Sequence, residues 1–384
     1  MRSTLRLCAA LVVLSAFAYA CGVANESALS DFGGEGTGAR GDAAPNEGPS
    51  AGASPTDLAP VDNAVILVHA AKALPFRLCF ENELDRRPLP DADLMPESNV
   101  VGVEVGSAVR LGPLRGAPGM IFVIDEFALR FPTSEQPSCQ KALSRPEPIP
   151  YAIRLPPGPQ NTAADKDLSK GVHLLVLTGC TGNTALNTYS QAECGSDWTP
   201  AAGNLAIKEI ELTGANRASP STLPAQIVNL SQPLESARAG RTLSITFGDL
   251  LAQGAKHEDV ASGPPLYGEA SPKEPATLTY TPEDLPSYDS LGFRVQLQPP
   301  GGGAAETVLE QSLARVQNLS APRDLPTSYF AAASNYALLL LGDPAPTFRD
   351  GGADDDPRRK LHLLAVPVIN PKGSGAGDAG ADAP

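Results

Sequence analysis

Thirty-eight prolines are spread along the 384 residues of this chain, and they leave little room for a long helix. Between them lie short runs rich in valine, isoleucine, leucine and phenylalanine, bounded by glycine or proline, and this pattern predicts β-strands. Only residues 306–316 also fit a helix, although a strand fits them equally well. Strands are expected at residues 64–70, 76–80, 100–105, 120–125, 151–155, 172–178, 205–212, 225–230, 243–247, 276–281, 293–297, 336–341 and 361–368.

Two landmarks recur in the same order and indicate an internal duplication. An apolar run that ends at a polar residue opens each half, at His69 and at Asn229. Another apolar run closed by glycine ends each half, at Gly179 and at Gly342. Because the spacing is nearly the same in both halves, the pattern favours two copies of one domain.

The many short strands predict an all-β protein, because two packed sheets are the usual way to bury the apolar faces of such strands. We therefore expect two tandem antiparallel β-sandwich, immunoglobulin-like domains, at residues 62–200 and 201–368. Residues 21–61 and 369–384 are rich in Gly, Ala, Ser, Pro and Asp and poor in large apolar side chains. Such composition predicts a disordered N-terminal tether and a disordered C-terminal tail.

The first 20 residues have the order of a secretory signal peptide: Arg2 and Arg6, then an apolar stretch, then Ala18-Tyr19-Ala20. The apolar stretch is too short to span a bilayer, which needs about 20 residues. Simple cleavage after Ala20 fits the small residues there. The segment also resembles a bacterial lipobox, in which Cys21 would carry the lipid, although Ala18 stands where lipoboxes usually have leucine. A lipid-anchored protein is favoured over a secreted or periplasmic one and over an uncleaved anchor.

Four cysteines remain beyond this segment, and an even number in an exported chain predicts two disulfides. Three pairings are open. Cys180 and Cys194 bracket a polar loop that a local bridge would close, which leaves Cys79 with Cys139. Zinc is the alternative use of four cysteines, but no C-x-x-C spacing is present, so we expect neither a metal nor a cofactor.

A formal net charge of −14 disfavours nucleic acid and anionic lipid surfaces as partners, because both require clustered lysine and arginine. Aspartates at residues 350 and 354–356 supply calcium-type ligands, but their spacing does not match a calcium loop. The G-x-S-x-G pattern at residues 48–52 lies in the predicted tether, where no nucleophile elbow can form. These patterns predict no catalytic site.

The four histidines and the single tryptophan are the other candidates for chemistry. His69, His173 and His362 lie in apolar strands, where a hydrogen-bonded ring is the ordinary explanation, and His257 lacks a second histidine at metal-binding spacing. Trp198 follows the Cys180–Cys194 loop. Filling the junction between domains is the favoured role of Trp198, and the speculative alternative is a ligand-binding residue that would stack on a sugar or anchor a partner.

The strand that ends at His69, followed by residues 76–80, resembles the opening of a bacterial extracytoplasmic domain family of unknown function. Repeats of that family begin Val-Arg-Val-Val-His-Ala-Ser-Pro. His69 and Ala70 match, while Ala71 and Lys72 stand where Ser-Pro would be, and the second copy has Asn229 in place of the histidine. The resemblance implies tandem β-sandwich domains in a secreted protein or lipoprotein and supplies no catalytic residues.

These observations predict a non-catalytic lipoprotein of the cell envelope that acts as a binding or scaffolding module for an envelope protein or a glycan. Gly22 after Cys21 replaces the aspartate that favours retention at the inner membrane in similar lipoproteins, so outer-membrane placement is expected. One alternative is a purely structural envelope protein. Another is an extracellular hydrolase, for which Glu81, Asp125 and Glu126 would be the carboxylates that need to converge.

Overall fold

A computed structural model of the chain describes most of the residues between 63 and 368. The predicted signal peptide, Cys21, the tether and the tail lie outside the described residues, which group into one compact unit within residues 51–384. The described residues are 63–90, 102–111, 114–125, 137–144, 152–183, 188–214, 222–238, 240–251, 258–260, 266–279, 290–316, 330, 335–345 and 358–368.

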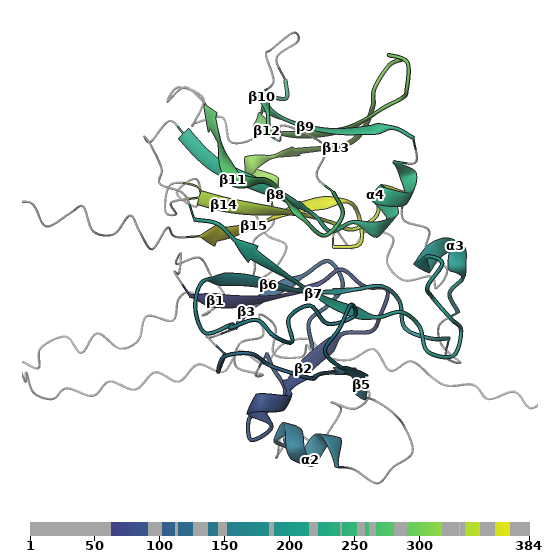
Figure 1. Ribbon diagram of the computed structural model, residues 1–384. Coiled ribbons are helices and arrows are strands. Elements are labelled where there is room, and N and C mark those ends of the chain that lie inside the picture. Colours follow the sequence, from purple (N-terminus) through teal and green to yellow (C-terminus); the bar gives the residue numbers. More distant parts are fainter. Residues whose placement is uncertain are drawn as a thin grey trace, which may run out of the picture. The chain divides into compact units, whose positions relative to one another are not determined.

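The first half of the described chain forms two sheets, with strand orders β3-β1-β6-β7 and β2-β4-β5. Figure 1 shows the first of these as neighbouring ribbons of β1, β3, β6 and β7. The strands are β1 (Ala64–His69), β2 (Phe76–Phe80), β3 (Ala108–Leu111), β4 (Ile121–Asp125), β5 (Ala152–Leu155), β6 (Val172–Thr178) and β7 (Ala206–Leu212).

The second half repeats this arrangement, with sheets β11-β8-β14-β15 and β10-β9-β12-β13. Apart from the two-residue β10, each strand occupies the position of a first-half strand in the same order. The strands are β8 (Thr222–Asn229), β9 (Thr242–Asp249), β10 (Glu258–Asp259), β11 (Ala270–Thr279), β12 (Leu291–Gln298), β13 (Glu306–Ser312), β14 (Asn335–Leu341) and β15 (His362–Val368).

The pairing register shows that the two sequence landmarks are equivalent positions. His69 lies opposite Leu177 of β6, and Asn229 lies opposite Leu340 of β14. Both leucines lie two residues before the glycine that follows their own strand. Both side chains accept a hydrogen bond from the amide two residues later, at 3.3 and 3.2 Å. The two halves therefore share topology and local geometry, as a duplication predicts.

Three apolar clusters account for the burial of the strands. One cluster is formed by the two sheets of the first half, and a second by the two sheets of the second half. A third cluster joins the β3-β1-β6-β7 sheet to the β11-β8-β14-β15 sheet, with members such as Val68, Val176, Val228 and Leu339. We call this third cluster the seam.

The seam explains why β1, β6, β14 and β15 are apolar at nearly every position. In β1, Val65 and Leu67 belong to the first-half cluster, whereas Ile66 and Val68 belong to the seam. A strand that is buried on both faces shows no alternation of apolar and polar residues. Continuous apolar runs in this chain therefore mark strands that lie between two apolar layers, including the edge strand β15.

The structure confirms a mostly β protein and corrects several finer expectations. The β1–β6 and β8–β14 pairs are parallel, so two of the sheets are mixed and not antiparallel. These parallel pairs are buried on both faces, which is the environment in which parallel strands ordinarily occur. Of the expected strand at residues 100–105, the described residues 102–105 form only an isolated bridge at Val103, and residues 306–312 form a strand.

The halves also meet at a different place from the one expected. Strand β7 lies beyond the predicted boundary at residue 200, but it pairs with β6 in the sheet that contains β1. The change from one half to the other therefore falls after Leu212. With β1 to β7 lettered A to G, the described order in the first half is C-A-F-G and B-D-E, whereas an immunoglobulin constant domain has A-B-E-D and C-F-G.

All described helices are short, and none is long and apolar enough to cross a membrane. They occupy connections at the ends of strands. They are η1 (Glu81–Glu83), α2 (Cys139–Leu143), α3 (Gln191–Cys194), α4 (Gln232–Ala237) and η4 (Leu313–Arg315).

Candidate functional site

Two disulfides hold loops of the first half, and both join the cysteines that the sequence pairs. Cys79 of β2 is bonded to Cys139 of α2, and Cys180 after β6 is bonded to Cys194 of α3. Because such bonds persist in oxidising compartments, they indicate an exported or extracellular protein.

Trp198 packs against the second disulfide and is almost fully buried, in a small cluster with Cys180, Cys194 and the partly buried Tyr189. Its indole Nε1 donates to the carbonyl of Thr181 at 2.9 Å. The prediction that Trp198 binds a ligand is therefore corrected, because neither the face nor the polar atom of the ring is presented to solvent. The ring stabilises its own loop.

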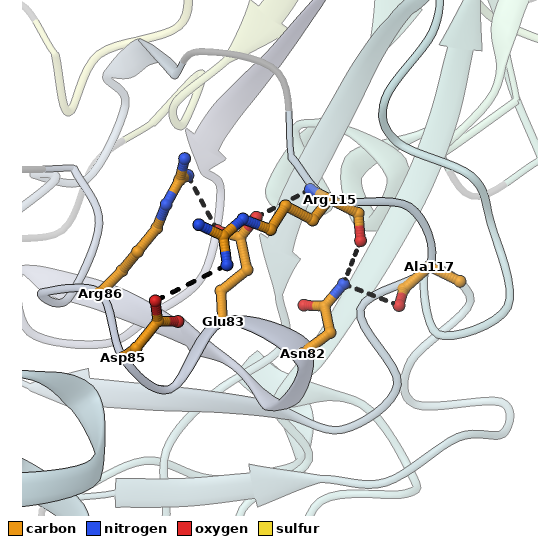
Figure 2. A network of polar contacts seen from close by, with 6 residues as sticks. All are labelled: Asn82, Glu83, Asp85, Arg86, Arg115 and Ala117. Atoms are coloured by element: carbon orange, nitrogen blue, oxygen red, sulfur yellow. Dashed lines mark hydrogen bonds and ion pairs between the residues drawn. The ribbon is translucent and has the colours of Figure 1, made fainter.

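The charged loops beside the first disulfide form the candidate site. Glu83, at the end of η1, is 1 % exposed, yet it carries a carboxylate (Figure 2). One carboxylate oxygen accepts from the main-chain amide of Arg115 at 2.7 Å, and the other accepts from the Arg86 guanidinium at 2.9 Å. A buried charge needs such partners, so Glu83 holds together two loops that are 32 residues apart in sequence.

Two further side chains of η1 hold the same second loop. Asn82 donates its amide to the carbonyls of Arg115 and Ala117, and Glu81 accepts from the amide of Met120 at 2.9 Å. We call residues 81–87 together with residues 114–120 the Glu83 loop cluster. Figure 2 shows Arg115 and Ala117 of the second loop reaching Asn82 and Glu83 of the first.

Most of the side chains that the cluster presents to solvent are charged, namely those of Glu81, Asp85, Arg87 and Arg115. Asp85 and Arg115 are 69 % and 61 % exposed and form an ion pair at 3.6 Å. The Cys79–Cys139 bridge and main-chain bonds from Cys139 to Arg86 and from Gln140 to Leu84 attach α2 to the first loop. The arrangement presents exposed carboxylates and guanidinium groups on two loops that are joined to each other, which suits recognition of a polar partner.

Replacing Glu83 by glutamine tests the support for this cluster. The substitution preserves the shape of the side chain and removes its charge, so we expect a loss of about 2 kcal/mol in the free energy of unfolding, measured by urea denaturation. Asp85→Asn is the matched control, since its exposed ion pair contributes about 0.5 kcal/mol or less. Equal effects of the two substitutions would contradict the role assigned to Glu83.

His69 and His362 have structural hydrogen bonds. Burial lowers the pKa of His69 to about 4, and the neutral ring accepts from the amide of Ala71 and lies 3.2 Å from the carbonyl of Leu74. His362 lies 2.7 and 3.0 Å from the carbonyls of Lys360 and Gly106. Both rings thus fix the main chain at the ends of strands. His257 lies outside the described residues.

His173 is a buried histidine paired with a carboxylate. Its Nδ1 lies 2.7 Å from Glu209 and its Nε2 lies 2.6 Å from the carbonyl of Lys170, so both nitrogens face acceptors. Burial alone would lower the pKa of His173. The hydrogen bonds to Glu209 and Lys170, with the charges of Glu209 and Glu211, outweigh burial and raise the pKa. The ring is therefore best satisfied when it is doubly protonated.

This pair predicts a pH-dependent contribution to stability. A pKa raised in the folded state gives stability that is complete below the unfolded value of about 6.5 and is lost as pH rises through the folded pKa. We expect His173→Gln to lower the melting temperature at pH 6 and to have a smaller effect at pH 9. Thermal unfolding of both proteins across this range measures the difference, and a gap that widens with pH would contradict the pairing.

The described residues do not bring together the carboxylates that the hydrolase alternative requires. Glu81 is bonded to the main chain at the start of β4, whereas Asp125 ends that strand, roughly 17 Å away at about 3.4 Å per residue. The side chain of Asp125 and all of Glu126 lie outside the description, as do the aspartates at 350 and 354–356 and the serine at 50. No group of three or more potential metal ligands occurs among the described residues.

Sequence reasoning missed Glu83. Its segment, Glu-Asn-Glu-Leu-Asp-Arg-Arg, has the composition of an ordinary solvated turn. The one available signal was its position directly after the strand that contains Cys79, because a disulfide at that place fixes the turn.

Comparison of the chain with protein-family models, with curated proteins and with solved structures finds no match.

Proposed function

We propose that the chain is a non-catalytic binding or scaffolding module of the cell envelope. The observation that carries this proposal is the Glu83 loop cluster, in which a buried carboxylate and a disulfide support exposed, oppositely charged side chains. Ordering surface loops in this way costs conformational entropy, and preorganised loops on a rigid sheet scaffold are a common basis of recognition. The partner is an envelope protein or a glycan that offers complementary polar groups.

We interpret the two sets of sheets as tandem β-sandwich domains that arose by duplication. The matching strand orders and the equivalent positions of His69 and Asn229 support this interpretation. The first half is immunoglobulin-like in having seven described strands in two sheets, and the second half has the equivalent strands together with β10, although the described strand order differs from the immunoglobulin order.

We also propose that Cys21 attaches the protein to the membrane through a lipid, with the outer membrane as its place. The support is the lipobox-like segment before Cys21 and the two disulfides of an exported fold. A Cys21→Ala protein should no longer incorporate labelled palmitate and should leave the membrane fraction. Continued labelling of that variant would disprove the lipid anchor.

Site-specific photo-cross-linking in cells tests the binding function. A photoreactive residue replaces Asp85 in the Glu83 loop cluster, and in a matched control it replaces Leu251, which is 77 % exposed in the second half. A defined adduct that forms only from position 85, and that Glu83→Gln weakens, supports the module. Equal adducts from both positions, or none from either, would favour the purely structural alternative.

A further inference from the structure

The segment before β6 connects the Glu83 loop cluster to a buried histidine. We call this segment, residues 156–171, the strap; it joins β5 to β6, and all of it is described. The amide of Leu168 donates to the carbonyl of Gly116 at 3.2 Å, and the amide of Gly119 donates to the carbonyl of Ala164 at 3.0 Å. The strap is therefore hydrogen-bonded directly to the second loop of the cluster.

Buried contacts also join the strap to this loop. Leu168 is 1 % exposed and belongs to the first-half cluster, together with Leu114 at the start of the loop. Asn161 of the strap donates its side-chain amide to the carbonyls of Gly119 and Leu155, each at 3.0 Å. The position of the strap therefore determines how the loop is supported.

His173 fixes the end of the strap that lies next to these contacts. Its Nε2 lies 2.6 Å from the carbonyl of Lys170, and its Nδ1 lies 2.7 Å from the carboxylate of Glu209 in β7. Lys170 is two residues from Leu168, so the contact to the histidine and the contact to Gly116 are adjacent along the strap. The histidine thus joins the strap to β7 beside the place where the strap holds the loop.

Removal of one proton from His173 breaks this arrangement. A neutral imidazole has one donor and one acceptor, so it cannot donate to both the carboxylate and the carbonyl. The proton stays toward Glu209, because hydrogen bonds to a charged group are the stronger ones. Nε2 then turns a lone pair toward the Lys170 carbonyl, which is also an acceptor. The neutral ring therefore repels the strap at Lys170.

The charged groups around His173 favour the protonated ring. Glu209 and Glu211 act on it from β7, and Asp167 lies near it in the strap, with Lys170 close to that carboxylate. Strand β1, on the other side of β6, places an apolar side chain opposite it. Burial lowers the pKa of His173, but the hydrogen bonds to Glu209 and Lys170 outweigh burial and raise the pKa above the ordinary value of about 6.5. The proton is therefore lost as pH rises from neutral into the alkaline range.

We propose that protonation of His173 controls the order of the Glu83 loop cluster through the strap. With the ring charged, the strap is fixed and the loop of residues 114–120 is held in place. With the ring neutral, the strap loosens and the loop opens more often. The inference rests on the proposed function for its consequence, which is that partner binding weakens as pH rises. By linkage, a bound partner makes His173 harder to deprotonate.

Hydrogen–deuterium exchange of the full chain tests this coupling without a partner. Exchange is measured by mass spectrometry from pH 6 to pH 9 and is corrected for the intrinsic effect of pH on exchange. We expect peptides that cover the strap and residues 114–120 to lose about fivefold in protection over this range, the effect of one hydrogen bond. Peptides that cover β12 in the second half are the internal control and keep their protection. Unchanged protection of the strap and the loop would overturn the proposal.

Two substitutions distinguish a pH switch from a purely structural contact. Glu209→Gln keeps the shape of the partner and removes its charge, so the loss of protection should occur at lower pH. His173→Gln cannot titrate, so its protection should show no step with pH. A step that persists in His173→Gln, or that stays at the same pH in Glu209→Gln, would overturn the proposal. If His173→Gln does not fold, the profiles of the wild type and of Glu209→Gln decide.

Photo-cross-linking from position 85 in cell suspensions buffered at pH 6 and pH 9 tests the consequence for binding. Adducts that weaken at pH 9, in step with the exchange data, support control of recognition by His173. Equal adducts at both pH values would overturn that control. Absence of adducts at both pH values would contradict the proposed function, and the exchange profiles would still decide whether His173 controls the loop.

Discussion

Replacing Cys79 and Cys139 together by alanine is expected to lower the free energy of unfolding by about 4 kcal/mol, because the bridge closes a loop of 60 residues. A disulfide restricts the unfolded chain, and its effect on the entropy of that chain increases with the length of the loop. Both cysteines are buried, and together they attach α2 to β2. Urea denaturation of the variant and the wild type, followed by circular dichroism, measures the loss.

The second bridge provides the matched control. Cys180 and Cys194 are 14 residues apart, so the corresponding double alanine variant is expected to lose about 3 kcal/mol. The order of the two effects is the informative result. A larger loss from the short bridge would show that local packing around Trp198, and not loop length, sets the contribution of the disulfides.

Leu338→Ala and Leu339→Ala are each expected to lower the free energy of unfolding by roughly 2 to 5 kcal/mol. These neighbours in β14 point to opposite faces of their sheet, and both are fully buried. Leu338 packs in the second-half cluster and Leu339 packs in the seam. Removing either side chain leaves a cavity in a close-packed interior.

Strand β9 supplies the comparison, because its burial alternates. Ile245 is buried in the second-half cluster, whereas its neighbour Thr246 is only partly buried on the other face. Ile245→Ala should cost as much as either leucine variant, and Thr246→Ala about 1 kcal/mol or less. If Leu339→Ala were as mild as Thr246→Ala, the seam would not be a packed interface.

Much of the candidate site could not be predicted from the sequence, although its covalent support could. The Cys79–Cys139 bridge was the favoured one of three possible pairings, since a local bridge between Cys180 and Cys194 leaves these two cysteines, and the structure has this pairing. Glu83 was not, because its burial arises when the turn before β4 folds over η1. Burial of Trp198 was the favoured expectation, but at the junction between domains; the structure packs it against its own loop instead, because Cys180, Cys194 and Tyr189 cover it.

The sequence alone determined the properties that depend on short stretches of chain: the positions of most strands, the predominance of β-structure and the repeated landmarks at His69 and Asn229. Strand propensity and the effect of proline act over a few residues, so they are visible in the sequence. The parallel pairs, the boundary after Leu212 and the seam were decided by tertiary structure. An apolar run such as β14 shows that both faces are buried, but which sheets cover those faces depends on contacts between residues more than 100 positions apart.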